Sequence, residues 1–277
     1  MISNKEKFLK YRPKKFLGQN FLVDDNIARK IIRSLNINEN EPLLEIGPGH
    51  GSLTKHLVKI SKNYAAIELD KNIFKKLKQQ FGKNIKIINK DFLELDFNTD
   101  LKGVFNDDRK IKIIGNIPYN ITTEILFKLF EIRNRIDSIV MMIQKEVAQR
   151  LTAKPNTKDY GILAIQTQLN SEPSILFNVP PTAFFPKPKV HSSVIRLEFG
   201  KEKYNLYNKE LFTRIVKESF GKRRKTMRNS LKDFLTDLNI NTSLINFDFS
   251  RRPENVSIGE FVNFSNEIFE LKKTSND

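Results

Sequence analysis

The chain has 277 residues, of which 39% are hydrophobic, so it is long enough for one large domain with a real core and a smaller second domain. The absence of cysteine excludes disulfides, zinc–thiolate sites and iron–sulfur clusters. Lys and Arg outnumber Asp and Glu by 48 to 32, and the resulting formal charge of +16 favours a polyanionic partner, although a generally Lys-rich amino-acid usage would also explain it.

The amino-terminal segment, MISNKEKFLKYRPKK, has no apolar targeting stretch, and no apolar run of 18 residues occurs in the sequence. We therefore expect a cytoplasmic protein with no membrane partner. Residues 5–15 carry six basic side chains against one Glu, which is typical either of a solvated arm or of one that contacts phosphates. The three histidines, His50, His56 and His191, do not have a metal-ligand spacing, so no bound metal is expected.

Strand-like and helical segments then alternate along the chain. An amphipathic helix is predicted over about 25–35, with Asp near its start. Short β-rich runs follow at 42–47, 64–69, 85–90, 111–116 and 138–144. Helix-period apolar positions lie between them at 52–60, 71–81 and 122–132. This βαβ repetition predicts an α/β fold with a doubly wound, mostly parallel sheet.

The pattern changes after about residue 160. A helix is predicted over 160–169, and two strands, 174–179 and 190–199, complete the sheet as an antiparallel edge pair. The strands then disappear, and helical segments follow at 208–219, 225–236 and 257–271. We therefore place one domain boundary near residue 200, which divides the chain into domains 1–200 and 201–277.

A candidate nucleotide site lies where the first three predicted parallel strands end. The segment EIGPGHG (45–51) places Gly47 in a turn that allows close approach of a ligand to the backbone, but it matches neither the dinucleotide fingerprint nor a P-loop. Glu68 closes the second strand and Asp91 the third. Strand-end acids often only cap the next helix, but their succession at the carboxyl edge of a parallel sheet favours binding of a nucleotide-like ligand.

The segment GNIPYN (115–120) follows the fourth predicted strand. Pro118 cannot donate to a sheet ladder, so this strand is expected to end near Asn116. The segment then presents an amide, a backbone carbonyl fixed by proline and the aromatic ring of Tyr119. These groups suit the binding of a planar molecule.

Taken in order, E-x-G-x-G-x-G, the two strand-end acids and N-I-P-Y resemble the S-adenosylmethionine-dependent methyltransferases that act on exocyclic amines. The segments LGQNFL (17–22), FFPKPKVHSS (184–193) and RRKTMRNSL (223–231) resemble the signature segments of the KsgA (RsmA) family of small-subunit rRNA adenine dimethyltransferases. The resemblance covers nearly the whole chain. It implies a Rossmann-like S-adenosylmethionine-binding methyltransferase domain and a small all-helical C-terminal domain that binds RNA.

The resemblance implies a role for five residues toward S-adenosylmethionine. Asn20 and Leu22 would contact the cofactor, and Gly47 would pass beneath its methionine part. Glu68 would hold the ribose and Asp91 the adenine amine.

It also implies the catalytic groups. Asn116 would face the methyl-donor side of the cofactor, and its side-chain oxygen and the Pro118 carbonyl would accept the hydrogens of the target amine. Tyr119 would stack on one face of the extruded adenine, and Phe184, rather than its neighbour Phe185, on the other. The reaction would require no metal, because alignment of donor and acceptor supplies most of the acceleration.

The implied substrate is 16S rRNA within an immature small (30S) ribosomal subunit, dimethylated at two adjacent adenosines of the 3′-terminal hairpin loop. Nothing in the sequence indicates an obligate dimer, so a monomer is expected. RNA phosphates would contact Arg223, Arg224, Lys225 and Arg228, although a solvated helix face is an alternative for this cluster.

Two other functions remain open. The Erm family, which methylates an adenosine of large-subunit (23S) rRNA, shares the N-I-P-Y and F-x-P-x-P-x-V segments, but RRKTMRNSL favours the KsgA pattern. A non-catalytic RNA-binding assembly factor of the same fold would not need the acceptor groups around Asn116. Ile117 in place of the more familiar Leu, and His191 at a position often taken by Asp, are mild departures from the family pattern.

Overall fold

The computed structural model describes residues 18–105, 109–200 and 202–274, so the basic arm at 5–15 lies outside the described residues. The chain divides into two compact units, one of Met1–Ala148 with Ser171–Gly200 and one of Gln149–Asn170 with Lys201–Asp277. One boundary between these units falls at residue 200. The structure differs from the predicted division at 149–170, which group with the C-terminal helices.

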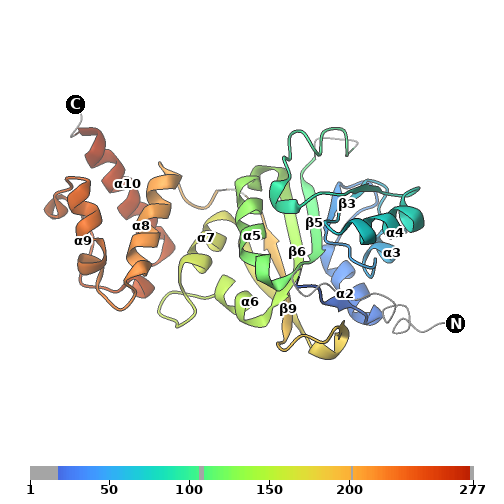
Figure 1. The fold of residues 1–277 in the computed structure, drawn as a ribbon. Coiled ribbons are helices and arrows are strands. Elements are labelled where there is room, and N and C mark those ends of the chain that lie inside the picture. The colour runs from blue at the N-terminus through green and yellow to red at the C-terminus, as the bar shows by residue number, and fades with distance from the viewer. Residues whose placement is uncertain (1–17, 106–108, 201, 275–277) are drawn as a thin grey trace. The chain divides into compact units, whose positions relative to one another are not determined.

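A seven-stranded sheet forms the centre of the first unit (Figure 1), with the strand order β4-β3-β2-β5-β6-β9-β7. The first five strands pair in parallel, and β9 pairs antiparallel with both β6 and β7. The strands are β2 (Leu43–Ile46), β3 (Tyr64–Ile67), β4 (Lys86–Ile88), β5 (Ile111–Asn116), β6 (Ile136–Gln144), β7 (Glu172–Val179) and β9 (Ser192–Glu198). The predicted parallel sheet with an antiparallel edge pair is confirmed.

The helices that follow the parallel strands begin at capping residues. Asp24 accepts a hydrogen bond from the Ile27 backbone N–H at the start of α2, and Asp70 caps α4 in the same way. The apolar stripe of α2 packs with Val140 and Met142 of the sheet in one core cluster. The helices of this unit are α2 (Asp25–Leu35), α3 (Thr54–Leu57), α4 (Lys71–Phe81) and α5 (Thr122–Glu131); α6 (Lys145–Leu151), which was not predicted, runs across the boundary of the two units.

The second unit is helical and has its own core, in which Phe212, Leu231 and Phe261 are fully buried. It contains α7 (Ile162–Asn170), α8 (Lys209–Gly221), α9 (Met227–Asp237) and α10 (Ile258–Thr274). The C-terminal helical segments predicted from the sequence are confirmed. No helix in the described part of the chain is long and apolar enough to span a membrane.

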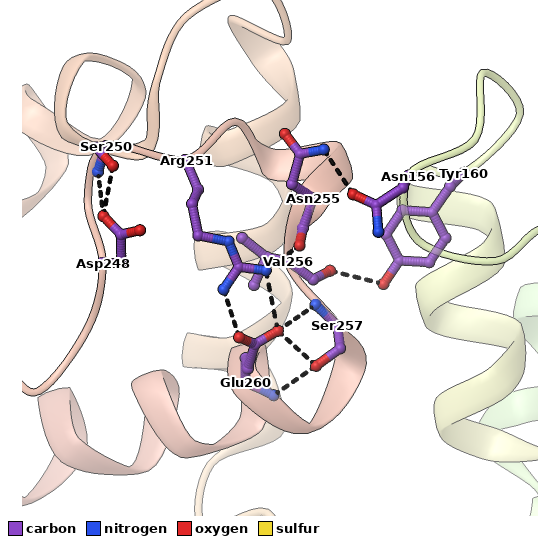
Figure 2. A network of polar contacts seen from close by, with 9 residues as sticks. All are labelled: Asn156, Tyr160, Asp248, Ser250, Arg251, Asn255, Val256, Ser257 and Glu260. Atoms are coloured by element: carbon purple, nitrogen blue, oxygen red, sulfur yellow. Dashed lines mark hydrogen bonds and ion pairs between the residues drawn. The ribbon is translucent and has the colours of Figure 1, made fainter.

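Polar contacts explain why 149–170 group with the C-terminal helices (Figure 2). The Tyr160 hydroxyl, on a fully buried side chain, donates to the Val256 carbonyl at 3.0 Å, and Asn255 Nδ2 donates to Asn156 Oδ1 at 2.7 Å. Tyr160 and α7 also belong to the apolar core of this unit. The predicted boundary followed the change from strands to helices, which gives no information about such contacts between distant segments.

A capping box fixes the start of α10 in the same network (Figure 2). The Ser257 N–H and hydroxyl both donate to the Glu260 carboxylate, at 2.8 and 2.7 Å, and the Glu260 N–H donates to the Ser257 hydroxyl at 3.3 Å. Arg251 forms an ion pair with the same carboxylate. The Arg251 guanidinium lowers the pKa of Glu260 to about 2.

Candidate functional site

The glycine-rich turn after β2 has the conformation that its sequence predicted. Gly47, Gly49 and Gly51 all have positive φ angles, of 65°, 55° and 79°. A Cβ atom on Gly49 would lie 3.1 Å from the Phe21 ring, so this position combines left-handed backbone with close packing. A Cβ atom on Gly47 would meet only the Asn116 carbonyl, at 3.8 Å, which leaves the backbone accessible there.

Glu68 joins the end of β3 to this turn. Its side chain is 6% exposed, and its two carboxylate oxygens accept from the Gly49 N–H at 3.0 Å and the Asp70 N–H at 2.9 Å. Burial raises the pKa of Glu68, and these backbone hydrogen bonds partly oppose the rise. Each carboxylate oxygen can accept more than one hydrogen bond, so Glu68 can hold the turn and still accept from a ligand hydroxyl.

Glu45 is a site residue that the sequence reasoning missed. It is 1% exposed, accepts from Thr54 Oγ1 at 2.7 Å and from the Tyr64 hydroxyl, and lines the same cavity as Glu68. Burial raises the pKa of Glu45 to about 7. The sequence could have indicated Glu45, because an acid inside the buried run LLEI is tolerated only where its carboxyl group has hydrogen-bond partners.

The amide of Asn116 has a fixed orientation at the end of β5. Its Nδ2 donates to the Asn20 carbonyl at 3.0 Å, so Oδ1 is left as an acceptor. The Pro118 carbonyl, by contrast, already accepts from Thr122 Oγ1 at 3.2 Å and from the Ile121 N–H at 3.4 Å. The Pro118 carbonyl therefore helps to start α5. The neighbouring Ile117 carbonyl, by contrast, accepts no hydrogen bond within the described residues.

The Tyr119 ring is held by Ser192, in the segment that follows Phe184. Its hydroxyl and the Ser192 hydroxyl share a hydrogen bond of 2.5 Å, and burial raises the pKa of Tyr119, so the phenol stays protonated near neutral pH. This contact connects two motifs that lie 73 residues apart.

A two-stranded sheet that was not predicted brings the N-terminal motif to the site. In it, β1 (Phe21–Leu22) pairs antiparallel with β8 (Phe184–Phe185). Phe184 is 4% exposed and belongs to the same core cluster as Leu22, whereas Phe185 is half-buried. In this conformation the Phe184 ring is therefore covered by the core, and a base cannot stack on it unless the ring is uncovered.

One cavity of about 70 Å³ gathers most of the predicted site residues. Asp91 and Phe184 are not in its lining; Asp91 Oδ1 instead accepts from the Leu93 N–H at 2.9 Å and begins a 3₁₀ turn. The predicted residues that line it are Asn20, Leu22, Gly47, Glu68, Asn116, Pro118 and Tyr119.

The lining fits a cofactor that contains a ribose and an amino-acid part. It offers a buried carboxylate on Glu68, the orienting amide of Asn116 and the accessible backbone at Gly47. Small-molecule sites typically have volumes of roughly 300 Å³ or more, so this cavity by itself is smaller than a nucleoside-sized ligand requires. A neighbouring cavity of about 280 Å³ shares four wall residues with it: Leu22, Gly49, His50 and Ser52. Among the described residues, no group of three or more His, Asp or Glu side chains is arranged to hold a metal ion.

The predicted RNA-contact residues lie in the second unit. The turn between α8 and α9 contains Arg223, Arg224 and Lys225, and Arg228 is in the first turn of α9; all four are exposed. Arg223 donates to the Lys158 carbonyl at 2.7 Å and lies 3.9 Å from the Glu254 carboxylate, so it ties this turn to 149–170. The other three side chains have no partner within the part of the chain that the structure describes.

Comparison with known proteins shows which family the chain is similar to. The family model of ribosomal RNA adenine dimethylases matches residues 11–270. A ribosomal RNA small subunit methyltransferase A from Francisella tularensis subsp. novicida is 42% identical over 260 residues, which is 93% of this chain and 98% of that one. A protein of the same name from Alkaliphilus oremlandii is 41% identical over 264 residues, 92% of this chain and 91% of that one.

Solved structures show the same fold. The crystal structure of a dimethyladenosine transferase from Plasmodium falciparum superposes with a TM-score of 0.74 at 25% identity and covers 91% of this chain and 98% of that one. The 23S rRNA methyltransferase ErmE has a TM-score of 0.62 at 24% identity and covers 90% of this chain and all of that one. The predicted Rossmann-like methyltransferase fold with a helical C-terminal region is confirmed.

Proposed function

The chain belongs to the ribosomal RNA adenine dimethylase family and is an adenine dimethyltransferase, and from this premise we propose that its substrate is 16S rRNA. It transfers methyl groups to N6 of two adjacent adenosines in the 3′-terminal hairpin loop. The observation that carries the proposal is the fixed amide of Asn116, whose Oδ1 is free to accept while Nδ2 is held by the Asn20 carbonyl.

Family membership implies S-adenosylmethionine as the methyl donor, which supplies an electrophilic methyl group when bound. Glu68 would accept from its ribose hydroxyls, and the backbone at Gly47 would lie against its methionine part. Asn20 and Leu22 would close the cavity over it from β1 and the segment before it. Asp91 would accept from the adenine amine with the carboxylate oxygen that does not bond Leu93.

The acceptors for the target amine lie in the turn at 116–118. An exocyclic amine is a weak nucleophile because its lone pair is delocalised, and two acceptors on its hydrogens favour a tetrahedral nitrogen. Asn116 Oδ1 is the first acceptor. The second is a backbone carbonyl fixed by Pro118, and since the Pro118 carbonyl already accepts two hydrogen bonds, we assign this role to the Ile117 carbonyl.

The adenine would stack on Tyr119, whose ring is oriented by the Ser192 hydroxyl. For the second face, the family pattern indicates Phe184, but its ring lies in the core, so the half-buried Phe185 fits the structure better. Methyl transfer then needs only alignment of the donor methyl with the amine nitrogen.

The second unit would bind RNA phosphates through Arg224, Lys225 and Arg228, with Arg223 in a structural role. Action in the cytoplasm on an immature 30S subunit, as a monomer, completes the proposal. The choice of small-subunit RNA as substrate is supported by the name of the curated relatives, which this chain matches over almost their whole length.

Two alternatives carry less support. The similarity to ErmE, at 24% identity, extends to the fold alone, whereas the relatives named for the small subunit are 41–42% identical. A non-catalytic assembly factor would have no need for an oriented Asn116 amide beside Tyr119.

Transfer of labelled methyl from S-adenosylmethionine to unmethylated small and large subunits tests the proposal. We expect label on small-subunit RNA only. Label on large-subunit RNA would support an Erm-type activity, and tight subunit binding without label would support the non-catalytic factor.

A further inference from the structure

Helix α4, which follows β3, presents a row of positive charge on its exposed face. Its 11 residues contain four lysines and no acid. Lys71, Lys75 and Lys78 are exposed and lie at positions i, i+4 and i+7, on the side of the helix away from the buried Ile73 and Leu77. We call these three lysines the lysine ridge.

This arrangement is locally unfavourable for the helix. Like charges at i and i+4 destabilise a helix, and Lys71 stands in the first turn, where the helix dipole already concentrates positive charge. Lys71 and Lys75 have no ion-pair or hydrogen-bond partner among the residues that the structure describes, and Lys78 lies over the Phe74 ring at 5.7 Å. An anionic partner would relieve both effects.

The ridge starts close in sequence to the end of β3. Lys71 follows Glu68 by three residues, and Asp70 fixes the start of the helix by accepting from the Asn72 and Ile73 N–H groups. A rise of 1.5 Å per residue places Lys78 about 10 Å further along the axis than Lys71. A polyanion bound at the active site could therefore continue along α4.

We propose that the lysine ridge is a second RNA-contact surface, which binds phosphates of the strand that flanks the target adenosine. This inference rests on the proposed function. Lysine ammonium groups on flexible stems suit phosphates, whose contacts position an RNA without reading its sequence. RNA is favoured over an acidic protein because the proposed substrate is RNA and Lys71 stands three residues after Glu68, which lines the candidate cofactor cavity.

The test is a triple variant, Lys71→Gln/Lys75→Gln/Lys78→Gln, which keeps helix propensity and removes only charge. The matched control, Lys59→Gln/Lys102→Gln/Lys110→Gln, makes the same change at three exposed lysines elsewhere on this unit. Lys110 immediately precedes β5, and Lys102 neighbours Gly103, whose carbonyl accepts from Lys86 at the start of β4. These two controls therefore lie near the amino ends of their strands, whereas Lys71 follows the carboxyl end of β3.

Binding to unmethylated small subunits is measured over a salt series, together with the kcat and KM of methyl transfer and the affinity for S-adenosylmethionine. For the ridge variant we expect the slope of log K against log salt to become less negative by about 3, one for each lost phosphate contact. KM for the subunit should rise while kcat and cofactor affinity stay unchanged. The control should keep the parent slope and KM.

A ridge variant with the same slope and KM as the control would overturn the inference, and would leave an acidic protein partner as the other explanation of the charge. A fall in cofactor affinity would also contradict it, because the ridge would then be part of the cofactor site. If the parent protein itself transfers no methyl to small-subunit RNA, the proposed function fails whatever the ridge variant does. Failure of the ridge and failure of the proposed function are thus distinguishable.

Discussion

Replacement of Asn116 by alanine is the most informative single change at the proposed active site. The variant removes Oδ1, the proposed acceptor for the target amine, and also the Nδ2 hydrogen bond to the Asn20 carbonyl. Loss of one preorganised acceptor typically lowers kcat by about 100- to 1,000-fold, and loss of one ordinary hydrogen bond costs about 1 kcal/mol of unfolding free energy. We therefore expect methyl transfer to be nearly abolished in a protein that still folds.

The assay is single-turnover transfer of labelled methyl to unmethylated small subunits, with S-adenosylmethionine affinity and subunit affinity measured in parallel. Both affinities should stay largely intact, because Glu68, the glycine turn and the basic residues are unchanged. Asn120→Ala is the matched control: Asn120 is exposed, belongs to the same GNIPYN segment and does not line the cavity. Near-normal turnover of Asn116→Ala, or an equal loss in Asn120→Ala, would refute the assigned role.

Four further predictions follow from single contacts. Phe184→Leu should lower the free energy of unfolding by about 1 kcal/mol because the ring lies in the core, whereas Phe185→Leu should change it little. Chemical denaturation checks both variants. A Phe184→Leu variant that keeps its stability but loses turnover would restore Phe184 as the stacking residue. Arg223→Ala should lower the free energy of unfolding with little change in the salt dependence of RNA binding. Arg224→Ala should weaken the salt dependence of RNA binding and leave the free energy of unfolding unchanged. Equal effects of the two variants in both assays would contradict a structural role for Arg223 and an RNA-contact role for Arg224. The pKa of Glu45 is raised from 4.5 to about 7 in the folded state, so the folded protein holds a proton that the unfolded chain releases, and the free energy of unfolding should fall as pH rises from about 5 to 7. Glu45→Gln should flatten this fall in urea titrations, and an unchanged pH profile would contradict the burial argument. The pKa of Glu260 is lowered to about 2, so its effect on the pH dependence of stability is opposite to that of Glu45: the stabilisation is present above about pH 4.5 and is lost as pH falls toward 2. Glu260→Gln should therefore lower the midpoint of thermal unfolding at neutral pH but not at the acid end.

Local signals in the sequence predicted most of the elements. The helices at 25–35 and 71–81 were predicted from helix-period apolar positions, for the first together with an Asp near its start, and Asp24 and Asp70 cap them in the structure. The end of β5 at Asn116 followed from the chemistry of Pro118. These features depend on residues close together in the chain, so a sequence reading reaches them.

Contacts between distant segments were not predictable in the same way. The pairing of β1 with β8 joins strands of two residues each, too short to give a periodic pattern. It places Phe184 beside Leu22 in the core, which no motif indicates. The grouping of 149–170 with the C-terminal helices likewise depends on Tyr160 and Val256, 96 residues apart.

Hydrogen bonding also decides which polar atoms of a motif remain available to a ligand. The Pro118 carbonyl is occupied by Thr122 and Ile121, and Arg223 is occupied by Lys158. A motif specifies which residues gather at a site, but the partner of each polar atom is decided by the packing around it.

The central claim is that the Asn116 turn directs methyl groups to N6 of two adjacent adenosines in one RNA hairpin. The most direct test is mass spectrometry of nucleosides and nuclease fragments from small-subunit RNA after reaction with the protein and labelled S-adenosylmethionine. We predict N6,N6-dimethyladenosine at two neighbouring positions of the 3′-terminal hairpin loop and nowhere else. Methyl groups on ring nitrogens or ribose, or on adenosines scattered outside that loop, would contradict the account.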